Sequence, residues 1–170
     1  MLRCAPSLLL AGLFGMLAAA SATATAPATA QAKPALASFE PDSLAQIVKA
    51  HQGKPFVLLL WSLDCPFCQL SLAALSRKKT SAARLDVVTL TTDAQGDAEI
   101  DAQVSARLRA LGLTRNAWAY GAAPPEQLRY AIDPKWHGEL PRSYWFDAHG
   151  KRVGYSGVLT PEIIRKLAGQ

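Results

Sequence analysis

Cysteine and histidine are scarce in this chain, which limits the kinds of site it can build. The 170 residues include three cysteines and three histidines. His51, His137 and His149 lie far apart, and no second cysteine pair could complete the four ligands of a structural zinc site. We therefore expect no zinc site and no metal or organic cofactor.

Charge is also sparse and shows little clustering. Lys and Arg number 18 and Asp and Glu number 13, which gives a net charge of +5. The only basic run is residues 77–79, far short of the basic stripe typical of nucleic-acid binding, so we expect no nucleic-acid partner. Half of the residues are apolar, which is enough for a core that needs no structural disulfide.

The N-terminal segment has the pattern of an export signal. Arg3 is the only charged residue among the first 32, and the apolar run from Leu8 to Leu17 then fades into alanine and threonine. This run is shorter than the about 20 residues needed to span a bilayer. We expect a signal peptide cleaved after Ala22 or Ala32 and a periplasmic protein, with an uncleaved N-terminal membrane anchor as the alternative.

Removal of a signal peptide would leave two of the three cysteines in the mature protein. The expected boundaries are a signal peptide at 1–32, a flexible leader at 33–37 and one folded domain at 38–170. Cys4 lies ahead of the apolar run and is removed with the signal, so the mature domain keeps Cys65 and Cys68. Outside the cytoplasm disulfides form and persist.

Strand and helix patterns alternate along the domain. The expected helices lie at 44–51, 66–79, 97–111 and 124–131, with a last one after Thr160. The expected strands lie at 55–61, 85–91, 116–120, 143–146 and 152–155. The first strand is apolar throughout, as in a sheet covered on both faces, and the last two form a hairpin that turns at Gly150. This order predicts an α/β fold with a mixed central sheet and helices on both faces.

The motif Cys65-Pro-Phe-Cys68 lies where the apolar strand turns into a helix. Residues three apart in the first helical turn share one face, so the two sulfurs can form a disulfide. The helix dipole and the free N–H groups at this end stabilise a Cys65 thiolate and lower its pKa. Cys68 continues an apolar stripe of the helix, so we expect Cys65 to be the exposed attacking thiol and Cys68 the buried resolving thiol.

Neighbouring residues complete this predicted site. Pro66 fixes φ near the helical value and stiffens the motif. Phe67 is expected to give the site an apolar surface, and Trp61 to pack beneath the loop. Asp64 would raise the pKa of Cys65 if its carboxylate approached the sulfur, and the sequence leaves its direction open.

These features resemble the thioredoxin superfamily and, more narrowly, its exported TlpA/ResA-like thiol–disulfide oxidoreductases. The resemblance covers residues 38 to 168 and is carried by segments 56–61, 65–68, 138–141 and 144–157. It implies a thioredoxin-like three-layer fold. It also implies a TlpA-type strand–helix insertion, expected between Asn116 and Ala131.

The resemblance also implies roles and partners. Cys65 is the nucleophile and Cys68 the resolving thiol, while Pro141, preceded by Leu140, looks like the family's cis-proline, which faces the disulfide and helps to hold the substrate backbone. Members of this branch usually reduce disulfides of exported proteins, as in apocytochrome c maturation. They receive electrons from a membrane thiol transporter.

Departures from the family pattern leave the direction of electron flow open. Asp64 replaces the usual Trp before the first cysteine, Leu59 stands where thioredoxin has a buried acid, and Pro66 takes the first intervening position, as in glutaredoxins and several disulfide oxidases. We expect a protein-disulfide reductase. The alternatives are a disulfide oxidase or isomerase, and a metallochaperone in which both cysteines hold Cu(I), with His137 as the candidate further ligand.

Overall fold

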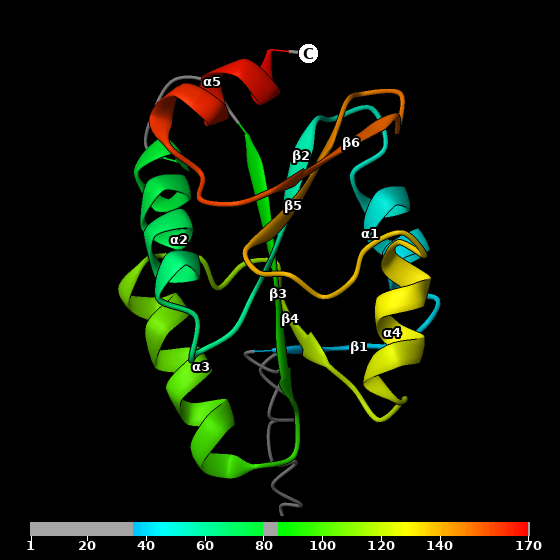
Figure 1. Ribbon diagram of the computed structural model, residues 1–170, viewed down its shortest axis with the longest axis vertical. Coiled ribbons are helices and arrows are strands. Elements are labelled where there is room, and N and C mark those ends of the chain that lie inside the picture. The colour runs from blue at the N-terminus through cyan, green and yellow to red at the C-terminus, as the bar shows by residue number, and fades with distance from the viewer. Residues whose placement is uncertain (1–35, 80–84, 170) are drawn as a thin grey trace, which may run out of the picture. The chain divides into compact units, whose positions relative to one another are not determined.

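The computed structural model describes residues 36–79 and 85–169 (Figure 1). The strands are β1 (Ala37–Phe39), β2 (Phe56–Trp61), β3 (Asp86–Ala94), β4 (Ala117–Tyr120), β5 (Arg142–Phe146) and β6 (Arg152–Ser156). The helices are α1 (Ser43–Ala50), α2 (Pro66–Lys79), α3 (Ala98–Ala110), α4 (Pro125–Ile132) and α5 (Pro161–Ala168). The expected signal peptide lies outside the described residues, and so do residues 33–35 of the expected leader.

The six strands form one mixed sheet in the order β1-β4-β3-β2-β5-β6. The first four in this order run parallel, and the β5–β6 hairpin joins β2 in the antiparallel sense. Strand β1 was not predicted. It is three residues long, too short to show a periodic pattern, and it exists because Ala37 and its neighbours pair with β4. Ordered structure therefore includes the last two residues of the expected leader.

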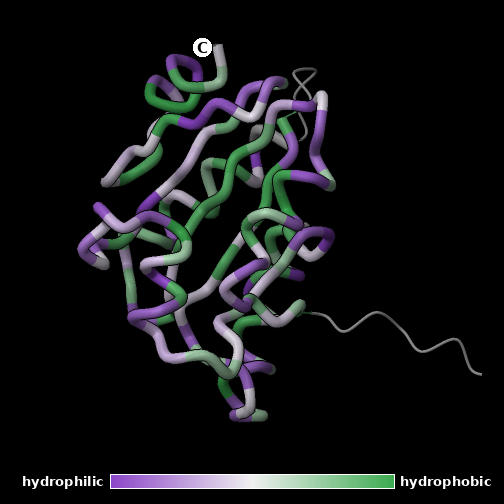
Figure 2. The backbone as a smooth tube through the Cα atoms, turned by 90° about the vertical axis from the view of Figure 1, so that its right-hand side faces the viewer, coloured by the Kyte–Doolittle hydropathy of each residue, from purple (hydrophilic) through white to green (hydrophobic). Residues whose placement is uncertain are grey.

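Strand β2 divides the core into two halves. All six of its residues are buried, and Val57, Leu59 and Trp61 contribute to one hydrophobic cluster while the alternate residues contribute to the other. The first cluster includes residues of α2, α3 and α5, and the second includes residues of α1 and α4. Figure 1 shows these two groups of helices on opposite sides of the sheet, and Figure 2 shows hydrophobic residues along the central strands. The predicted three-layer α/β architecture is confirmed.

Two further predictions about the C-terminal half hold. Strand β4 and helix α4 lie where the strand–helix insertion was expected, with α4 ending one residue later, at Ile132. The β5–β6 turn contains Gly150, whose φ of +81° lies in the left-handed region that favours glycine. No helix among the described residues is long and apolar enough to cross a membrane.

One buried hydroxyl ties α2 to the segment that follows β6. The fully buried Ser71 Oγ donates a hydrogen bond to the carbonyl of Phe67 at 3.2 Å and accepts one from the amide of Leu159 at 3.0 Å. This contact joins residues 88 positions apart in the chain. It therefore fixes the first turns of α2 against the C-terminal part of the domain.

We expect Ser71→Ala to lower the free energy of unfolding by about 1–3 kcal/mol, because it leaves the buried amide of Leu159 unpaired. Urea denaturation of the oxidised protein measures this change. The matched control is Ser105→Ala on α3, because the Ser105 hydroxyl has no hydrogen-bond partner among the described residues. Equal stability of the two variants would contradict the assigned contact.

Candidate active site

Cys65 and Cys68 form a disulfide at the start of α2. Their Cα atoms are 5.2 Å apart, Cys65 immediately precedes the helix, and Pro66 is its first residue. Cys68 is fully buried in the same hydrophobic cluster as Trp61, whereas Cys65 is partly exposed at the edge of that cluster. The two cysteine residues thus differ in exposure to solvent as the sequence predicts.

One backbone amide bonds to the Cys65 sulfur. The backbone amide of Cys68 donates a hydrogen bond to Cys65 Sγ at 3.1 Å, as expected at a helix N-terminus. Among the described residues, no Lys, Arg or His side chain bonds to this sulfur. Asp64 is exposed, and its carboxylate makes no hydrogen bond within the described part of the chain.

The connection from β2 to Cys65 is held from both sides. The amide of Leu63 donates to Asp93 Oδ2 on β3 at 2.9 Å, and the same oxygen accepts from the Thr91 hydroxyl at 2.5 Å. From α2, Gln69 Nε2 lies 3.4 Å from the carbonyl oxygens of Ser62 and Leu63. The sequence analysis missed Asp93 and Gln69, because only the pairing of β2 with β3 and the packing of α2 bring them to this connection.

An apolar surface lies next to the disulfide. Phe67, inside the motif, is 61% exposed, and Leu70, three residues further along the same helix, is 57% exposed. Only one other large hydrophobic residue of the described segments is comparably exposed, Tyr130 on α4 at 68%. Trp61 is fully buried below the loop, as expected.

The Leu140–Pro141 peptide bond, directly before β5, is cis. Because Arg142 pairs with Leu60 of β2, Pro141 lies near the end of β2, from which the chain leads to Cys65. The carbonyl of Pro141 accepts a hydrogen bond from the amide of Gly157 at 3.0 Å. Leu140 packs against both hydrophobic clusters, including the one that contains Cys68.

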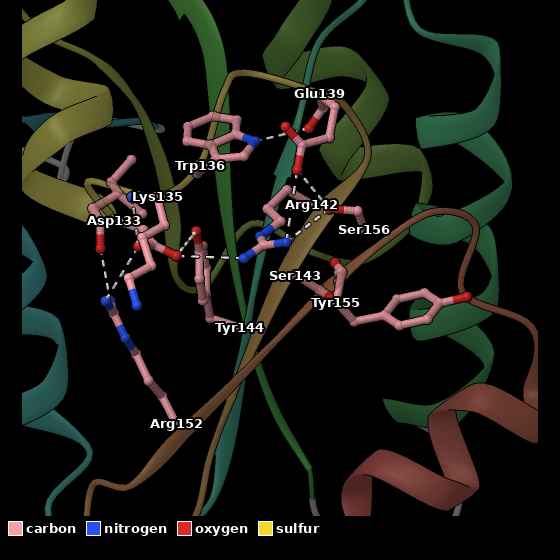
Figure 3. Close-up of polar contacts among 11 residues, drawn as sticks. Asp133, Lys135, Trp136, Glu139, Arg142, Ser143, Tyr144, Arg152, Tyr155 and Ser156 are labelled. Carbon is pink, nitrogen blue, oxygen red and sulfur yellow. Dashed lines mark hydrogen bonds and ion pairs between the residues drawn. The ribbon is translucent and has the colours of Figure 1, made fainter.

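A polar network that the sequence analysis missed surrounds this proline segment (Figure 3). The Asp133 carboxylate accepts hydrogen bonds from the Tyr144 hydroxyl at 2.9 Å, from Arg142 Nη2 at 3.3 Å and from the Lys135 amide at 3.0 Å. Arg152 lies 4.0 Å from the same carboxylate. The network therefore joins the end of α4 to both strands of the hairpin.

Two other features do not extend the site. Among the described residues, no three His, Cys, Asp or Glu side chains are grouped to hold a metal ion, so a Cu(I) site at the cysteines gains no such further ligand there, from His137 or elsewhere. A cavity of about 830 Å³ lies between α1 and the β5–β6 turn, and its lining contains neither cysteine nor Pro141. This cavity is therefore not part of the candidate site, which consists of the two cysteines and the residues around them.

Comparison with known proteins establishes the fold. No protein-family model matches the chain, and no curated protein matches it. A secreted disulfide oxidoreductase of Mycobacterium tuberculosis, homologous to DsbE of E. coli, matches with a TM-score of 0.51 and 19% identity over 71% of this chain and 84% of that one. A DsbF homologue of Corynebacterium diphtheriae matches with 0.57 and 14% over 72% and 74%, and the pneumococcal exposed lipoprotein thioredoxin of Streptococcus pneumoniae with 0.52 and 18% over 72% and 88%. The chain has a thioredoxin-like fold.

The network and its burial shift the pKa values of Asp133 and Tyr144. Burial acts to raise the pKa of Asp133, but the hydrogen bonds from Lys135 and Tyr144 and the charges of Arg152 and Arg142 lower it below its ordinary value. Burial is also the largest influence on Tyr144 and raises its pKa to about 12. Tyr144 therefore remains a protonated donor to the ionised Asp133 throughout the neutral range.

A lowered carboxyl pKa in the folded state adds stability above the ordinary pKa of about 3.9, and this stability disappears as the pH falls through the folded-state value. We therefore expect Asp133→Asn to reduce the free energy of unfolding by about 2 kcal/mol near pH 7, and by progressively less below pH 4. Chemical denaturation between pH 3 and 7 measures this difference. Glu126→Gln, an exposed change on α4, is the control, and a constant Asp133→Asn effect down to pH 3 would contradict the assignment.

Proposed function

We propose that this protein is a thiol–disulfide oxidoreductase that reduces disulfides of protein substrates outside the cytoplasm. The observation that carries the proposal is a disulfide in the first turn of a helix, with one sulfur partly exposed and the other buried. Such a pair can exchange with an external disulfide through its accessible sulfur only. The N-terminal signal pattern and the exported or surface-exposed proteins among the structural neighbours support the location.

The proposed reaction is two successive thiol–disulfide exchanges. The Cys65 thiolate attacks one sulfur of a substrate disulfide, which forms a mixed disulfide and releases the other substrate sulfur as a thiolate. The deprotonated Cys68 then attacks Cys65, releases the second substrate thiolate and closes the Cys65–Cys68 disulfide. Two electrons pass from the protein to the substrate, and an external dithiol, proposed to be a membrane thiol transporter, restores the reduced pair.

The environment of Cys65 supports the reducing direction. A strongly oxidising pair owes its high potential to a stabilised reduced form. Here the sulfur accepts a hydrogen bond from one backbone amide and bonds to no Lys, Arg or His side chain among the described residues. Because no bonded cationic side chain adds to the stabilisation of the thiolate by the helix N-terminus, we favour a reductase over the alternative oxidase or isomerase.

The exposed apolar surface supports a protein substrate. Phe67 and Leu70 place two large hydrophobic side chains beside the disulfide, where water must otherwise hydrate them. A polypeptide with apolar residues near its cysteine can cover this surface, with a gain of about 25 cal/mol per Å² of apolar area buried. We propose disulfides of exported proteins, with apocytochrome c as one candidate, as the substrates.

We expect the reduced protein to reduce insulin disulfides and Cys65→Ser to abolish this activity, because no accessible nucleophile remains. Cys68→Ser keeps the nucleophile but cannot resolve the mixed disulfide, so it should trap substrate in a covalent complex on a non-reducing gel. Circular dichroism confirms that each variant is folded. Insulin reduction by Cys65→Ser at the wild-type rate would disprove the assignment of the nucleophile.

The reduction potential of the Cys65–Cys68 pair tests the direction. We expect a value near the roughly −270 mV of thioredoxin rather than the about −120 mV of the strong oxidant DsbA. Equilibration of the protein with a dithiol redox buffer, followed by mass spectrometry of the alkylated thiols, measures it. A value close to that of DsbA would favour the oxidase.

We expect Phe67→Ser and Leu70→Ser each to lower kcat/KM for insulin about threefold or more, because each removes apolar area that the substrate covers. Their rates with the small disulfide dithiobis-nitrobenzoate should change much less. Tyr130→Ser removes an equally exposed aromatic residue from α4 and is the matched control. If all three variants reduced insulin equally well, the apolar surface would have no part in binding.

A further inference from the structure

We propose that the Arg142–Asp133 ion pair is a clasp that positions Leu140–Pro141 for protein substrates. It acts on the rate with polypeptide disulfides and not on the redox chemistry of the cysteines. The inference rests on the proposed function and deepens it, since it identifies positioning residues outside the cysteine motif.

The clasp closes the connection between α4 and β5. Asp133 follows the last residue of α4 and Arg142 is the first residue of β5, and their side chains meet at 3.3 Å across a separation of nine residues. The two side chains are only 14% and 16% exposed, so solvent and salt screen the pair weakly. The ion pair thus brings together the two ends of the segment that carries Leu140 and Pro141.

A second set of bonds fixes the residues on either side of Leu140–Pro141. Arg142 Nη1 donates to Ser156 Oγ on β6 at 2.7 Å, and the same hydroxyl donates to Glu139 Oε1 at 2.7 Å. The carbonyl of Glu139 also accepts a hydrogen bond from the indole of Trp136 at 2.9 Å. Figure 3 shows Arg142, Glu139 and Ser156 converging in this way. Both neighbours of the Leu140–Pro141 pair are therefore anchored to one hydroxyl of the hairpin.

Stability alone does not account for this arrangement. Ion pairs shielded from solvent are often replaceable by apolar residues without loss of stability, and this partly buried pair leaves Arg142 Nε without a hydrogen-bond partner among the described residues. The ring of Tyr144, 4.8 Å from the guanidinium carbon, also restricts where the guanidinium can lie. The network does hold Leu140–Pro141 in a single position, and misplacement of a binding group by about 1 Å can cost up to about 100-fold in rate.

The test compares two disulfides in the full-length protein: insulin, which presents a polypeptide backbone, and dithiobis-nitrobenzoate, which has none. We expect Arg142→Gln and Asp133→Asn each to lower kcat/KM for insulin about tenfold, with less than about twofold change for the small disulfide and an unchanged reduction potential. The double variant should lose no more than Arg142→Gln alone, because both residues act through one contact. Arg142→Lys, which keeps the charge but not the two-partner geometry, should recover part of the loss.

The controls separate this inference from a general loss of structure. Arg165→Gln breaks an exposed ion pair with Glu162 on α5 and should leave both rates unchanged. Should Arg142→Gln fail to fold, Ser156→Ala, at an exposed residue of β6, decides the question through the same two substrates. Equal losses with both disulfides, or normal insulin reduction by folded clasp variants, would overturn the inference. A wild-type protein inactive on both disulfides would overturn the proposed function and the clasp with it.

Discussion

The burial of β2 on both faces is the constraint from which the site follows. A strand with apolar side chains on both faces must lie in the interior of the sheet. The chain therefore leaves β2 at the strand's C-terminal end and enters α2 after a short connection. Helix α2 then buries one face against the sheet. Cys68, Leu72 and Leu75 lie on that face, and this packing withdraws one sulfur from water while the other stays partly exposed at the helix N-terminus.

The same packing explains why local patterns predict so much of the fold. Strand β2, helix α2 and the β5–β6 hairpin depend on interactions within one element or between neighbours, so their residue patterns show them directly. Strand β1 depends on pairing with β4, about 80 residues away, and its three residues have no pattern of their own. Elements whose stability comes from distant partners are the ones that a single sequence does not show.

The residues of the site likewise fall into those that the sequence shows and those that only the fold brings together. The cysteine motif and the residues inside it are visible in the sequence because the chemistry requires them at fixed spacing. Asp93 and the Asp133–Arg142 pair follow no spacing rule, since they reach the site through the pairing of β2 with β3 and of β5 with β2. Leu59 adds only apolar surface to the cluster around Cys68.

Hydrogen bonds also link the Leu140–Pro141 segment to the Cys65–Cys68 motif. The amide of Gly157 binds the carbonyl of Pro141, and two residues later the amide of Leu159 binds Ser71, whose hydroxyl donates to the carbonyl of Phe67 inside the motif. Residues 157–159 therefore hold the two parts of the site together from a third direction. Because the Gly157–Pro141 contact uses backbone groups on both sides, side-chain variation at Pro141 or Gly157 alters it only by moving the backbone. The distance between disulfide and proline segment is thus set mainly by the fold, and the Arg142–Asp133 clasp refines the path of the segment within it.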